Sequence, residues 1–175
     1  MTIATEVRTF GGFHVDNQSN APLQLLKLAR LTAEPEQVFA VIGDHAGMSS
    51  WIPGLTKIDV DSRGAAERGG EGAVRVCEFA DGSRLREEIV GWDPPRMYAF
   101  HIPDAFAFPE PSSFRRHLTV FTCESDGTGG TILGWRQYFE SAAPEAVRAF
   151  MAQIMDAAIG NLVARFGGRA VDPAG

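Results

Sequence analysis

The stretch PEAVRAFMAQIMDAAIGNLVARF, residues 144–166, decides the fold that we predict for this chain. Its apolar residues recur at steps of three and four, the spacing that places side chains on one face of an α-helix. This stripe consists of Val147, Phe150, Met151, Ile154, Met155, Ala158, Leu162 and Phe166. Gly167 and Gly168 follow, and glycine tolerates the left-handed backbone at which many helices end. The stretch therefore predicts an amphipathic helix of about six turns.

The sequence before this helix alternates short apolar runs with turn residues, a pattern typical of an antiparallel sheet. Strands are predicted at residues 23–32, 56–61, 73–80, 83–92, 97–102, 114–123 and 131–141, with turns at 68–72, 81–82, 93–95 and 126–130. The leucine-rich run 23–32 would also suit a short helix. Two short helices are predicted at 33–43 and 44–50, the first because Pro35 and its acidic neighbours are typical of a helix start.

These elements favour one architecture, because only the last helix is long enough to cover the sheet. We predict an α+β fold, with a curved antiparallel sheet of about seven strands wrapped around that helix. Since a sheet does not close tightly on a cylinder roughly 10 Å wide, the space between them is either filled by large side chains or left as a pocket. The predicted divisions are a loosely attached arm at 1–20, a folded domain at 21–168 and a tail at 169–175.

Composition and charge exclude several classes of protein. The chain has 175 residues, of which 45% are hydrophobic and 22% charged, as expected for one globular domain. A net charge of −6 argues against binding nucleic acid, whose phosphates attract Lys and Arg. No run approaches ~18 consecutive apolar residues, so we expect no membrane insertion, and no signal-peptide pattern opens the chain. Cys77 and Cys123 lie in no metal-binding motif, so we expect a cytoplasmic protein with free thiols, no metal and no cofactor.

Several short motifs, in their order and spacing, resemble the START-like superfamily, also called SRPBCC, and especially its bacterial polyketide cyclase/dehydrase and lipid-transport branch. The resembling pieces are residues 33–39 with Asp44, Trp51-Ile52-Pro53-Gly54, Gly72-Ala73-Val74-Arg75, Asp81-Gly82, Glu87, Asp93-Pro94-Pro95-Arg96, Thr131 with Trp135, and the final helix. The resemblance spans about Leu23 to Phe166. It implies a helix-grip fold that holds a ligand between the sheet and the helix, and it leaves the oligomeric state open.

The resemblance and the alternation of strand residues together predict an inward-facing charged pair, Arg75 and Glu87. Counting outward from the Asp81-Gly82 turn places Arg75 roughly across from Glu88, with Glu87 as a neighbour. Burying either charge alone would cost roughly several kcal/mol, whereas a hydrogen-bonded pair offsets much of this cost. As catalytic residues, Arg75 would hold a ligand anion and Glu87 would orient the ligand or act as a base. A structural salt bridge is the equally weighted alternative.

Aromatic and thioether side chains supply the candidate ligand-binding surface, since aromatic faces stack on rings and methionine adapts to varied shapes. The candidates are Trp51, Phe79, Tyr98, Phe100, Trp135, Met151 and Met155. Ordinary core packing is the alternative for each of them. Asp44 and His45 offer a possible acid/base pair near the entrance, although adjacent residues seldom point the same way.

Three hypotheses of function follow from these residues. The first is a domain that binds or carries a small hydrophobic ligand, such as a lipid, an aromatic molecule or a polyketide-like molecule. The second is an enzyme similar to polyketide cyclases and dehydratases, which would use the same cavity for aldol cyclisation or water loss. The third is a protein-interaction module, for which the loop 103–113 is the candidate surface. The sequence contains no GxSxG, HExxH or phosphate-loop motif.

Overall fold

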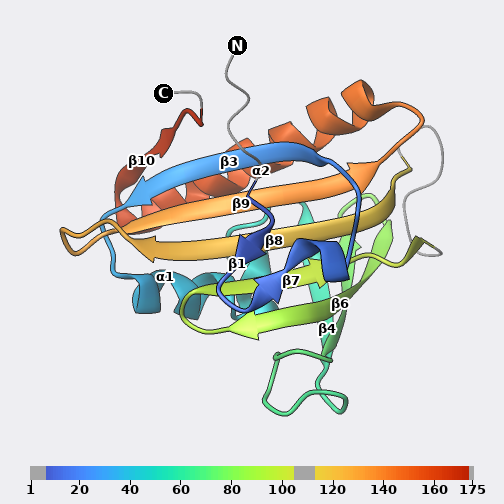
Figure 1. The fold of residues 1–175 in the computed structure, drawn as a ribbon, viewed down its shortest axis with the longest axis horizontal. Coiled ribbons are helices and arrows are strands. Elements are labelled where there is room, and N and C mark those ends of the chain that lie inside the picture. The colour runs from blue at the N-terminus through green and yellow to red at the C-terminus, as the bar shows by residue number, and fades with distance from the viewer. Residues whose placement is uncertain (1–6, 105–112, 174–175) are drawn as a thin grey trace.

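A single large antiparallel sheet forms most of the molecule in the computed structural model, which describes residues 7–104 and 113–173 (Figure 1). Eight strands lie in the order β10-β3-β9-β8-β7-β6-β5-β4. Their bounds are β3 Leu23–Leu31, β4 Leu55–Asp61, β5 Val74–Phe79, β6 Arg84–Asp93, β7 Met97–His101, β8 Arg115–Ser125, β9 Thr131–Glu140 and β10 Gly168–Val171. The strands and the two short helices follow one another as predicted, and the run 23–32 is a strand.

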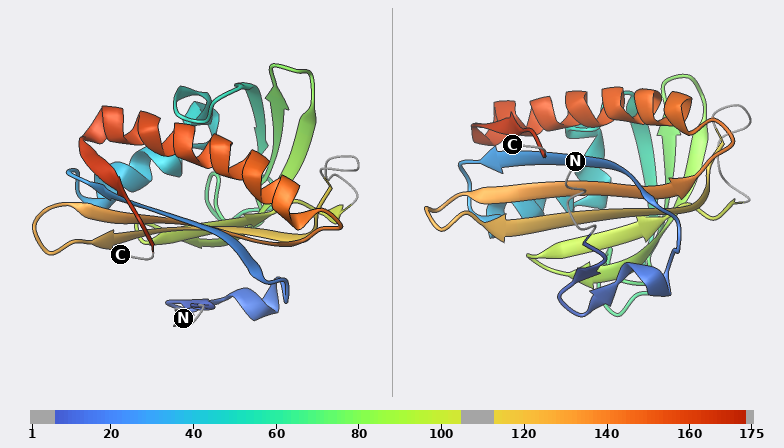
Figure 2. Two further views of the ribbon diagram at one scale, coloured as in Figure 1. Left: turned by 90° about the horizontal axis from the view of Figure 1, so that it is seen from above. Right: turned by 45° about the horizontal axis from the view of Figure 1, so that its top comes forward.

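The long helix α2, Pro144–Phe166, crosses one face of the sheet (Figure 2). Val147, Met155, Ala158, Ile159 and Leu162 are its buried residues, and they belong to the main core. The α+β helix-grip fold and the bounds of this helix are therefore confirmed. Phe150, predicted in the same stripe, is 46% exposed and borders a cavity.

Two short helices complete the inner face of the sheet. Helix α1, Pro35–Ile42, begins with proline in its first turn, and the side chains of Glu34 and Gln37 each bond the backbone of the other, a reciprocal cap. The second, η2 (His45–Ser50), is a tight 3-10 helix. Val38 and Ile42 of α1 are fully buried in the main core, so this helix covers the part of the sheet that α2 leaves open.

The N-terminal segment packs on the opposite, outer face of the sheet. It contains β1 (Thr9–Phe10), β2 (Phe13–His14) and the 3-10 turn η1 (Val15–Asn17). Phe10 and Val15 share a second apolar cluster with Met97, Ala99, Leu118, Val120 and Tyr138 of the sheet. The Tyr138 hydroxyl donates a hydrogen bond to the Val7 carbonyl at 3.0 Å. From Val7 onward, the segment predicted as an arm therefore lies on the sheet, and its apolar residues cover part of the outer face.

The end of the chain forms a strand that the sequence does not predict. Residues Gly168–Val171 form β10, which pairs with β3, although residues 169–175 are expected to be a tail. Gly167 and Gly168 adopt positive φ angles of 77° and 107°, which turn the chain back onto the sheet. A Cβ atom at Gly168 would lie only 1.9 Å from the Arg30 carbonyl oxygen, so this turn requires glycine.

Candidate functional site

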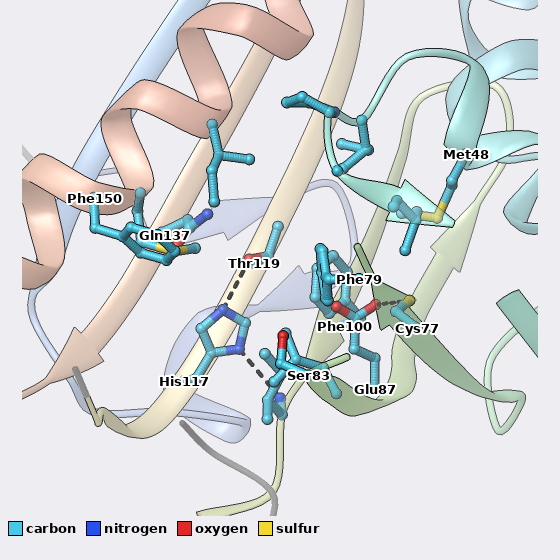
Figure 3. A pocket seen from close by; sticks show the side chains of 18 of the residues that line it. Met48, Cys77, Phe79, Ser83, Glu87, Phe100, His117, Thr119, Gln137 and Phe150 are labelled. Carbon is cyan, nitrogen blue, oxygen red and sulfur yellow. Dashed lines mark hydrogen bonds between the residues drawn. The ribbon is translucent and has the colours of Figure 1, made fainter. Parts of the chain in front are cut away.

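An apolar cavity of about 320 Å³ lies between α2 and the inner face of the sheet (Figure 3). Its walls come from strands β5 to β9, from the segment between η2 and β4, and from Phe150, Met151 and Ile154 of α2. Most of the lining side chains are apolar. The polar ones are Cys77, Asp81, Ser83, Glu87, His117, Thr119 and Gln137. This composition, an apolar wall with a few convergent polar groups, is typical of small-molecule sites.

The candidate ligand-binding residues divide between the cavity wall and the core behind it. Phe79, Phe100, Trp135 and Met151 line the cavity. Trp51, Tyr98 and Met155 are not among its lining residues and are 0–1% exposed. The Trp51 ring lies edge-on to Trp135, with ring centroids 6.0 Å apart, so it supports a wall residue from behind. Val147 and Ala158, which belong to the predicted helical stripe, are core residues as well.

Arg75 and Glu87 form the predicted ion pair, and both are buried, at 0% and 6% exposure. The register of β5 and β6 places them directly opposite each other, so the expected pairing with Glu88 is one residue off. Arg75 Nε donates to Glu87 Oε2. The Cys77 thiol donates to the same oxygen at 3.6 Å. Among the described hydrogen bonds, none engages the other carboxylate oxygen, Oε1.

The two partners differ in their access to the cavity. Glu87 lines it, whereas Arg75 is not among the described lining residues. The Phe100 ring, which does line the cavity, lies against the guanidinium with its centroid 4.4 Å away. Arg75 is therefore placed to hold Glu87 from behind, as a positioning residue, rather than to touch a ligand.

His45 joins this pair, a contact that the sequence does not reveal. Its Nε2–H donates to the Gly69 carbonyl at 2.8 Å, and its Nδ1 lies 2.7 Å from Nη1 of Arg75. Since a guanidinium only donates, Nδ1 is the acceptor and the ring is neutral. Burial first, and then the charge of Arg75, lower the pKa of His45 to about 3. The suggested acid/base pair with Asp44 at an entrance is not formed, because His45 points into the core.

This burial makes stability depend on pH. The pKa of His45 is depressed in the folded state, so the stability that its neutral form contributes is present above about pH 6.5 and is lost as the pH falls towards about 3. We expect a shift from about pH 7.5 to about pH 5 to lower the free energy of unfolding by about 2 kcal/mol through this residue. Urea denaturation at both pH values measures the loss.

A variant isolates the contribution of His45 to this pH dependence. His45→Asn keeps an acceptor for Arg75 without a titrating ring, so it should lose less stability on acidification than the wild type. His14→Asn, at an exposed position on β2, is the control and should behave as the wild type. An unchanged pH dependence in His45→Asn would contradict the assignment.

A second polar group lies on β8 and β9, across the cavity from Glu87. His117, Thr119 and Gln137 are 0–3% exposed, and Thr119 and Gln137 are cross-strand partners. The Ile102 N–H donates to His117 Nδ1 at 3.1 Å, and His117 Nε2 lies 3.1 Å from the Thr119 hydroxyl (Figure 3). Burial lowers the pKa of His117 to about 3, and the charge of His101 adds to this effect. The group is therefore uncharged.

Other kinds of site find no support among the described residues. No cluster of His, Cys, Asp or Glu within residues 7–104 and 113–173 has the geometry to hold a metal ion. Cys77 and Cys123 are free, and burial raises the pKa of both thiols, that of Cys123 to about 12. No helix in the described part of the chain is long and apolar enough to cross a membrane.

Together, these features define a helix-grip domain with a cavity between its long helix and its sheet. The family model described as polyketide cyclase / dehydrase and lipid transport matches residues 29–167, and the chain belongs to this family. No curated protein matches the chain.

Solved structures share the fold at low sequence identity. The protein XoxI from Bacillus cereus superposes with a TM-score of 0.65 at 19% identity, over 81% of this chain and 94% of that one. A protein from Thermobifida fusca superposes with a TM-score of 0.64 at 23% identity, over 82% of this chain and 92% of that one. Ara h 8.0201 superposes with a TM-score of 0.60 at 17% identity, over 81% of this chain and 94% of that one. At such identities the likeness supports the fold alone.

Proposed function

We propose that this protein binds a small, largely apolar ligand in the cavity between α2 and the sheet. The observation that supports this most strongly is the cavity itself, which offers about 320 Å³ of unfilled space beside the main core. Cores are normally close-packed, and voids larger than a water molecule are few. The aromatic side chains of Phe79, Phe100 and Trp135 line this space and would suit a ring system or a folded chain.

The titratable groups favour binding over acid-base catalysis. His45 and His117 are neutral, with pKa values of about 3, too low for a general base poised near neutral pH. The Cys77 thiol is also a poor nucleophile, because burial raises its pKa. A carrier or sensor of apolar molecules requires none of these groups to react.

A cyclase or dehydratase is the second candidate, supported by the position of Glu87. This carboxylate lines the cavity, where it would accept a proton from a bound ligand, and Arg75 would hold it in place. Loss of turnover in Glu87→Gln, with an intact fold and intact ligand binding, would support the enzyme. Turnover equal to that of the wild type would exclude a catalytic role for this residue.

Filling the cavity tests the binding proposal. Met151→Trp places an indole into the space from α2, so we expect N-phenylnaphthylamine, a neutral fluorescent probe, to bind at least about tenfold more weakly than to the wild type. The measurement is a fluorescence titration. Ala157→Trp, at an exposed position on the same helix, is the control and should bind as the wild type does. Equal affinity in both variants would contradict the proposal.

A further inference from the structure

We infer that the cavity selects a neutral ligand that carries a hydroxyl or carbonyl oxygen, bound by Thr119 and Gln137, and that it rejects carboxylates. This inference rests on the proposed function and names the class of ligand. It derives from three observations: the direction of the hydrogen bonds at Thr119, an unpartnered amide oxygen at Gln137, and the sign of the charges on the cavity wall.

The hydrogen bonds around His117 leave the Thr119 hydroxyl with a proton to donate. A backbone N–H only donates, so His117 Nδ1, which receives the Ile102 N–H, carries no proton. The neutral ring therefore holds its proton on Nε2 and donates it to the Thr119 oxygen. Among the described residues, no protein acceptor receives the hydroxyl proton of Thr119. Because Thr119 lines the cavity, a ligand oxygen is a suitable acceptor.

Gln137 adds an unpartnered amide oxygen beside this hydroxyl. The residue is 2% exposed and lines the cavity, and its Oε1 is buried without a hydrogen-bond partner among the described residues. Leaving such a group unsatisfied costs about 1–3 kcal/mol, so a bound partner there gains affinity. Either orientation of the amide presents an acceptor and a donor, which matches a hydroxyl or a carbonyl oxygen.

The charges on the cavity wall disfavour an anion. Glu87 and Asp81 both line the cavity, and the described lining residues include no Lys or Arg. The guanidinium of Arg75 is bonded to Glu87 and His45 and lies behind the Phe100 ring. A buried carboxylate on the ligand would therefore meet like charge and lose its hydration without a cation to replace it. The cavity should therefore bind a neutral ligand more tightly than an acidic ligand of equal shape.

Three ligands of matched shape test this selectivity: naphthalene, naphthol and naphthoate, each competing with N-phenylnaphthylamine near neutral pH. We expect naphthol to bind about fivefold more tightly than naphthalene, because it gains a hydrogen bond of about 1 kcal/mol. We expect it to bind at least about tenfold more tightly than naphthoate, because the described part of the cavity wall has no Lys or Arg to receive the carboxylate.

Variants assign the preference for naphthol to the two residues. Thr119→Val and Gln137→Leu keep the approximate shape of each side chain and should each lower the affinity for naphthol towards that for naphthalene. Thr122→Val is the matched control. Thr122 is also buried on β8, but it points to the outer face and receives a bond from Arg136, so this variant should keep the preference.

The outcomes separate this inference from the proposed function. If the fluorescent probe binds but naphthoate competes as well as naphthol, the inference is wrong and the binding function stands. The same conclusion follows if naphthol has no advantage over naphthalene, or if both cavity variants retain that advantage. If neither the probe nor any of the three ligands binds, the proposed function itself fails.

Discussion

Replacing Glu87 by leucine is expected to lower the free energy of unfolding by about 3–5 kcal/mol, because it leaves the charge of Arg75 buried without its counter-ion. Arg75 is fully buried, and its remaining described hydrogen bond is to a neutral imidazole, that of His45. The carboxylate is therefore the principal partner of this cation. Urea denaturation of the wild type and of Glu87→Leu measures the change.

A double variant separates the loss of the pair from the loss of packing. Arg75→Met combined with Glu87→Leu removes both charges and keeps apolar volume, so it should be more stable than Glu87→Leu alone. The unfolding free energies of the four proteins, the wild type among them, form a double-mutant cycle. A coupling energy near zero would contradict the view that Arg75 and Glu87 act as one buried unit.

Replacing Trp51 by alanine is expected to cost a comparable amount, about 3–5 kcal/mol, because it opens a void in the core behind the cavity wall. The ring is 1% exposed and packs edge-on against Phe121 and Trp135, with both centroids 6.0 Å away. Asn161 of α2 donates a hydrogen bond to the Trp51 carbonyl at 3.0 Å, which ties this segment to the helix. Thermal and urea denaturation both report the loss.

The matched control for Trp51 is another aromatic residue near the cavity. Phe150 is 46% exposed, so Phe150→Ala should cost less than about 1 kcal/mol. A small effect of Trp51→Ala, close to that of Phe150→Ala, would show that Trp51 is not the support of the wall that its packing indicates.

Local patterns were sufficient to predict the helices α1, η2 and α2 and the strands β3 to β9. The spacing of three and four in residues 144–166 reflects the periodicity of a helix and correctly predicts the bounds of α2. Alternation along β5 and β6 places Arg75 and Glu87 on one face, and the short Asp81-Gly82 turn makes their strands neighbours. The error of one residue in their register arises because counting from a turn does not reveal how the turn itself is closed.

Long-range contacts could not be predicted in the same way. His45 reaches Arg75 from thirty residues away in sequence, and only the path of η2 across the sheet brings the two together. The strand β10 is short, and its pairing with β3 depends on the turn at Gly167 and Gly168. Which aromatic residues border the cavity also depends on packing, since Trp51 and Trp135 have the same chemistry and only Trp135 lines it.

The Trp135 indole provides the most direct test that a ligand occupies this cavity. Its Nε1 is buried without a hydrogen-bond partner among the described residues, and the side chain lines the cavity. The protein has three tryptophans, and heteronuclear NMR resolves an N–H signal for each indole. During titration with naphthol, we predict that the Trp135 signal shifts with saturation, while the signal of Trp92, which does not line this cavity, stays in place. Saturation of the protein without a shift at Trp135 would contradict the account.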